Sequence, residues 1–143
     1  MNTSAALQIA AKVAQLTELC TTFQAKFGKR FAFTPESPAE AYELHRAICD
    51  KQADIAELLD PESLHNPMKK ASEWWRWQNT MDMATAGELA RETNHLIASC
   101  AYAEAAPPED GPSHAVAAAQ EAIAGMLHPE VRDRVLAQAL SMA

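Results

Sequence analysis

Residues 37–60 read SPAEAYELHRAICDKQADIAELLD, and this stretch carries the clearest amphipathic pattern in the chain. With side chains turning by about 100° per residue, the aliphatic positions share one narrow arc, made up of Ala41, Leu44, Ile48, Ile55 and Leu59. The opposite arc is anionic and is made up of Glu40, Glu43, Asp50, Asp54 and Glu57. Ser37, Pro38 and Glu40 are typical of a helix start with a capping box, and the Asp–Pro step at 60–61 disfavours helical backbone. We therefore expect a long helix that turns its aliphatic residues inward and its carboxylates towards water.

A second long helix is predicted upstream, from about Ser4 to Phe27. Its apolar side chains follow a 4-3-4-3-4 spacing, which keeps one seam facing a neighbour, and they are Ile9, Val13, Leu16, Cys20, Phe23 and Phe27. Gly28 should end this helix, because glycine readily takes the left-handed conformation. In the connector that follows, Phe31 and Phe33 alternate with other residues, a pattern that also fits a short extended piece. The two long helices are expected to form an antiparallel hairpin.

Shorter helical patterns continue downstream. One helix should run from about residue 67 to 82, and the next carries an apolar face of Leu89, Thr93, Leu96, Ile97, Cys100 and Ala103. Whether these two join is open, because Gly87 permits a break and Thr85 with Glu88 could cap a fresh helix. A Pro-rich loop at 105–113 precedes a helix at 113–127. A last helix carries Val131, Val135, Leu136 and Leu140.

These patterns predict an all-α fold, a compact bundle of five to six helices in one domain spanning residues 1–143. Only 4 glycines occur, and the composition of 48% hydrophobic and 22% charged residues is that of a globular chain. We expect no signal peptide and no membrane span. The 3 cysteines are far apart and form no CxxC motif, which favours reduced thiols and a cytoplasmic location.

All three tryptophans lie in EWWRWQN, residues 73–79. On a helix Trp74 would point to the apolar arc, with Trp75 and Trp77 on either side of it. Three rings this large do not fit one narrow seam, so three interpretations are open. They fill a core between two neighbours, they anchor a protein partner, or they stack on nucleic-acid bases.

The carboxylates of residues 37–60 also have two interpretations. The simpler one is a solvated helix face that keeps the protein soluble. The other is a binding surface for a basic partner, since closely spaced carboxylates can mimic phosphates and the net charge is −7. The candidate partner-binding residues are Glu40, Glu43, Asp50, Asp54, Glu57, Trp75 and Trp77.

A nucleic-acid-associated subunit is the alternative function. The chain holds two local basic clusters that could contact phosphates beside the tryptophans, and their residues are Lys26, Lys29, Arg30, Lys69, Lys70 and Arg76. The acidic total argues against direct nucleic-acid binding. The discriminating feature is whether these cations form one continuous patch.

Metal-binding and catalytic patterns are weak. His45 and Cys49 stand four residues apart and could share a metal ion, but a buried histidine beside an inert thiol is the simpler interpretation. Glu-x-x-His occurs at 62–65 and 92–95, as in di-iron bundles, yet the first lies between prolines and His95 lies outside the apolar arc. No phosphate-binding, hydrolase or HExxH motif is present. We therefore expect no enzymatic activity, no metal and no cofactor.

Together these features favour a non-enzymatic protein-interaction module, a small acidic inhibitor, adaptor or accessory subunit. In size and charge the chain resembles small acidic helical proteins that block nucleic-acid-handling machinery, phage-encoded inhibitors among them. This resemblance is to a class and rests on no shared motif.

Overall fold

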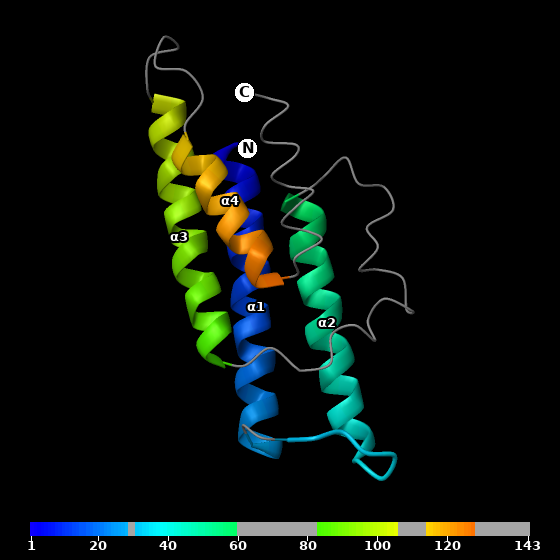
Figure 1. The fold of residues 1–143 in the computed structure, drawn as a ribbon. Coiled ribbons are helices and arrows are strands. Elements are labelled where there is room, and N and C mark those ends of the chain that lie inside the picture. Colours follow the sequence, from blue (N-terminus) through cyan, green and yellow to red (C-terminus); the bar gives the residue numbers. More distant parts are fainter. Residues whose placement is uncertain (29–30, 60–82, 106–113, 128–143) are drawn as a thin grey trace.

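The computed structural model describes residues 1–28, 31–59, 83–105 and 114–127. Four α-helices account for most of these residues: α1 (Thr3–Phe27), α2 (Ala39–Leu59), α3 (Met83–Ala105) and α4 (His114–Leu127) (Figure 1). The described part contains no strand, which confirms the all-α class. It has four helices, fewer than the five to six expected. The helices predicted at 67–82 and around 131–140 lie outside the described residues.

The ends of α1 follow from local backbone chemistry. The Asn2 side chain accepts a hydrogen bond from the Ala5 N–H at 2.8 Å, so it caps the first turn. At the other end Gly28 has a φ of 83°, and its N–H donates to the Gln24 carbonyl at 2.9 Å. Glycine takes this positive φ without the cost of a Cβ clash, and the helix ends there as predicted.

The start of α2 differs from the predicted capping box. The Ser37 hydroxyl accepts a hydrogen bond from the Thr34 N–H at 2.8 Å and so closes a turn before the helix. Glu40 forms an ion pair with Lys26 of α1 and does not close a capping box. α2 is described up to Leu59, and the Asp–Pro step at 60–61, where the helix is predicted to end, lies outside the described residues.

The predicted weak point at Gly87 does not break the helix. α3 is continuous from Met83 through Gly87 to Ala105, so Thr85 and Glu88 start no separate helix. Its junction with the helix predicted at 67–82 lies outside the described residues. Ala86 and Leu89 on either side of the glycine are fully buried. Their packing outweighs the roughly 1 kcal/mol that a mid-helix glycine costs relative to alanine.

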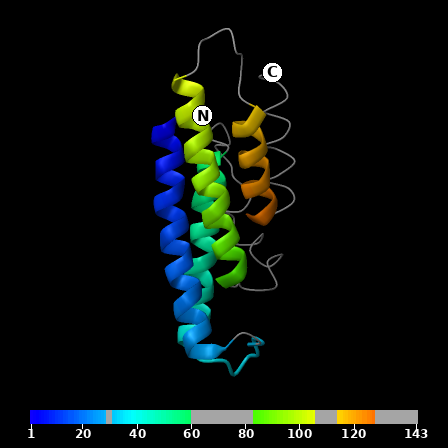
Figure 2. The ribbon, with the colours of Figure 1, turned by 90° about the vertical axis from the view of Figure 1, so that its left-hand side faces the viewer.

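The helices form a bundle in which spatial neighbours are antiparallel. The Lys51 ammonium donates to Gln15 Oε1 at 2.7 Å, which sets the antiparallel register of α1 and α2. Both the N–H and the hydroxyl of Thr3 donate to the Glu104 carboxylate, at 2.7 and 2.8 Å, and set the antiparallel register of α1 and α3. α2 and α3 are therefore parallel, one on each side of α1, and α4 packs back along α3 (Figures 1 and 2).

The core lies where the predicted seams meet. α1 contributes the expected apolar row, α2 contributes Ile48 and Ile55, both 0% exposed, and α3 contributes Leu89 and Leu96. The inward direction predicted for the aliphatic arc of α2 is thus confirmed. α4 adds Ile123 to the half of the bundle that holds the N-terminus of α1 (Figure 1).

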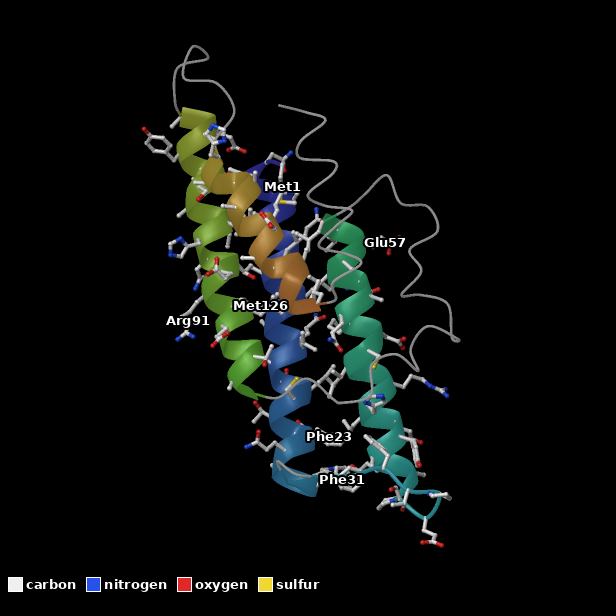
Figure 3. All side chains as sticks on the ribbon, in the orientation of Figure 1. Met1, Phe23, Phe31, Glu57, Arg91 and Met126 are labelled. Atoms are coloured by element: carbon white, nitrogen blue, oxygen red, sulfur yellow. The ribbon has the colours of Figure 1, made fainter. Side chains whose placement is uncertain are left out.

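An aromatic cluster closes the opposite end of the bundle. Phe23 of α1 lies 5.6 Å from Phe31 and 5.9 Å from Phe33, measured between ring centroids (Figure 3). Phe33 also contacts Tyr42 and His45 of α2. Residues 31–34 form no strand. Their rings, and not backbone pairing, fasten the turn between α1 and α2.

Candidate functional site

The carboxylates of α2 divide into two sets with different surroundings. Glu40 pairs with Lys26, and the Asp54 carboxylate lies 3.9 Å from the Lys12 ammonium. Both lysines belong to α1, so these two acids lie along the border between α1 and α2. Glu40 is exposed, as expected, and Asp54 is half-buried, but each pairs with a lysine of α1 and so helps to hold the helical hairpin together.

The second set, Glu43 and Asp50, is not paired with a lysine of α1. Glu43 and Asp50 are exposed, and no ion pair joins either of them to another described residue. Arg46, also exposed, lies between them along the same helix. Glu57 is half-buried and makes a further contact, and it lines a shallow groove between α1 and α2 together with Asp54 and Lys12.

We call the surface formed by Glu43 and Asp50 the α2 anionic face. With the positive charge of Arg46 between them, the two negative carboxylates give this part of the helix a formal net charge of −1. An anionic face of this kind attracts a cationic surface, and the attraction weakens as salt screens it.

His45 and Cys49 face one another beside the aromatic cluster. The distance from His45 Nε2 to Cys49 Sγ is 3.6 Å. Burial lowers the pKa of His45, whereas burial and the neighbouring Asp50 carboxylate raise the pKa of the Cys49 thiol to about 12. Both groups are therefore neutral at neutral pH, which is the opposite of what an activated thiolate needs.

No third potential ligand joins this pair within the described ranges, where no three His, Cys, Asp or Glu side chains converge. His95 is exposed on α3, whereas Cys100 of the same helix is buried. The Glu-x-x-His element at 62–65 lies outside the described residues.

The tryptophans and most of the candidate cations also lie outside the described residues. This holds for Trp75 and Trp77 among the partner-binding candidates. It holds equally for the cations Lys29, Arg30, Lys69, Lys70 and Arg76. Lys26, the remaining cation, is bound to Glu40. The continuous basic patch that the nucleic-acid alternative requires stays a prediction.

Two features of α2 were missed at the level of sequence. The first is the pairing with α1, although a signal for it existed. Lys12 and Lys26 are two heptads apart in α1, and Glu40 and Asp54 are two heptads apart in α2. Equal spacing of opposite charges is expected when two antiparallel helices pair along their borders. The second is Gln52, which is only 2% exposed although it is polar. Its position on the inner arc of α2 would have indicated burial.

Comparison with known proteins leaves the chain without a relative. No protein-family model matches it, and none of the curated proteins or solved structures matches it significantly. Among the described helices, none combines the length and the apolar character needed to cross a bilayer. The function therefore has to be argued from the residues themselves.

Proposed function

We propose that this protein acts without catalysis, by binding a basic surface of another protein through the α2 anionic face. Small acidic inhibitors, adaptors and accessory subunits work in this way. The observation that supports the proposal is the division of the α2 carboxylates. Two are neutralised by α1 lysines, while Glu43 and Asp50 keep exposed, unpaired charges within the described part of the chain.

The rigidity of α2 supports the same proposal. The helix is held by the buried side chains of Ile48 and Ile55 on its inner face and by the two lysine pairs at its border. A partner would therefore meet charges that are already in place and would spend little free energy on ordering them. Trp75 and Trp77 remain candidates for apolar anchors next to such a contact.

The experiment is a pull-down from a native lysate with the wild-type protein and a Glu43→Lys, Asp50→Lys variant. The matched control is Glu88→Lys, Glu121→Lys, which makes the same change in net charge on α3 and α4. We expect a specific protein to be retained by the wild type and the control and lost with the α2 variant. Its affinity should fall as salt rises.

Equal retention by all three proteins would refute the role of the α2 anionic face. If instead the captured partner is released by nuclease treatment, and the purified protein binds single-stranded nucleic acid at low salt, the nucleic-acid alternative replaces this proposal.

A further inference from the structure

The outer side of α1 carries a second regular row of residues, opposite its buried seam. The row repeats with a spacing of 4-3-4-3-4, every member is exposed, and it consists of Leu7, Ala11, Ala14, Glu18, Thr21 and Ala25. Only Glu18 is charged. Leu7 is the one large apolar member of the row and is 53% exposed.

α3 carries a matching row. It has the complementary spacing of 3-4-3-4-3, every member is exposed, and it consists of Ala84, Gly87, Arg91, Asn94, Ala98 and Ala101. Only Arg91 is charged, and it points away from the bundle (Figure 3). We call the two rows together the α1–α3 face. α1 and α3 pack side by side (Figure 2). Each row lies on the exposed side of its own helix, opposite the buried seam, and we infer that the two rows border one outer face of the pair.

The two rows correspond position by position. The contact between Thr3 and Glu104 fixes which residues lie at the same height. Leu7 lies four residues after Thr3, and Ala101 lies three residues before Glu104, so Leu7 and Ala101 lie at about the same height. Following α1 forwards and α3 backwards along the two rows brings Glu18 to the same height as Arg91. The face therefore places one carboxylate and one guanidinium at the same height on neighbouring helices. Arg91 also pairs with Glu88 of its own helix at 3.9 Å, and the Arg91 side chain remains 75% exposed.

The packing of the described helices does not require a glycine at position 87. A Cβ added there would meet nothing within 4 Å, and its backbone φ is not positive. Glycine destabilises a helix interior relative to alanine, so the described part of the fold gains no stability from it. A glycine at an exposed helix position does allow the backbone of another helix to approach closely.

We propose that the α1–α3 face binds a second copy of this chain. The two subunits are related by a two-fold axis parallel to the helices. This axis packs α1 of one subunit against α3 of the other, and the two helices run antiparallel, as α1 and α3 do within one subunit. Glu18 then meets Arg91 of the partner subunit, and the symmetry makes this pair twice. Leu7 then lies opposite Ala101 of the partner subunit, and Thr21 lies opposite Gly87 of the partner subunit. The face is complementary to itself in both charge and size.

The area is sufficient for a stable contact. A helix of 25 residues is about 37 Å long. Two such helices side by side, with axes about 9 Å apart, present a face of roughly 700 Å². Standard protein interfaces bury about 800 Å² on each partner. The contact leaves the α2 anionic face uncovered, so it does not depend on the function proposed above.

The test is analytical ultracentrifugation of the untagged protein at concentrations up to about 0.2 mM, high enough to reveal a dimer with a Kd near 10 µM. We expect a reversible dimer. Glu18→Arg and Arg91→Glu should each raise the Kd by about tenfold or more, and the double variant should restore it, since the exchanged charges pair again. Ala98→Trp should abolish the dimer by steric exclusion. Circular dichroism would verify that each variant is folded.

Glu43→Arg is the matched control, because it reverses an exposed charge on a different face and should leave the Kd unchanged. A wild-type protein that stays monomeric over the whole range would overturn the proposal. A dimer with a Kd that responds neither to Ala98→Trp nor to the single charge reversals would overturn it as well, because its interface would then lie elsewhere.

Discussion

Truncation of Phe23 to alanine should weaken the protein more than any other single change in the aromatic cluster. The Phe23 side chain is 6% exposed, and its ring centroid lies 5.1 Å from that of Phe27. It also contacts Phe31 and Phe33, so it joins α1 to the connector that leads into α2. The substitution removes the ring at the point where these three elements meet.

The magnitude follows from burial and from the ring contacts. Replacing a buried phenylalanine by alanine costs about 3–5 kcal/mol, because apolar contacts are lost and a cavity remains. Native domains have a total stability of only about 5–15 kcal/mol. In a chain of this size the melting temperature falls by about 2–4 °C per kcal/mol. We therefore expect the Phe23→Ala variant to melt roughly 10 °C below the wild type.

The assay is urea unfolding followed by far-ultraviolet circular dichroism, with a thermal scan on the same samples. Phe23→Leu should lose less, because it fills part of the cavity. Tyr102→Ala is the surface control, since Tyr102 is 71% exposed and its loss should change stability by about 0.5 kcal/mol at most. A loss below about 1 kcal/mol for Phe23→Ala would show that the cluster does not hold the hairpin closed.

Three further predictions concern α2. Gln52 is buried, and its amide has no hydrogen-bond partner among the described residues, so Gln52→Leu should raise the free energy of unfolding by about 1–3 kcal/mol; a loss in urea unfolding would contradict this. Burial lowers the pKa of His45 from 6.5, so the unfolded chain binds the proton more readily and stability should fall as pH drops below 6.5. His45→Gln should flatten that decline in a pH series of urea titrations, and an unchanged slope would refute the assignment. The Cys49 thiol, with its pKa raised to about 12, should react with iodoacetamide far more slowly in the folded protein than in urea at the same pH, as mass spectrometry can measure.

The sequence determined the four described helices and the C-terminal end of α1. The 3-4 spacing of apolar residues specified which side of α1 and α2 is buried, and Ile48 and Ile55 lie inside as that spacing requires. Gly28 marked the end of α1 correctly. These features are local, because periodicity and backbone preference depend only on residues a few positions apart.

Only the tertiary structure decided which carboxylates of α2 remain free. Glu40 and Asp54 look like Glu43 and Asp50 in sequence, but the packing of α1 brings a lysine to each of the first two. The continuity of α3 through Gly87 was decided in the same way, by the burial of its neighbours. Such outcomes depend on the register between helices, which is set by contacts between residues far apart in the chain. A helical period gives the direction of a side chain but not the identity of its neighbour.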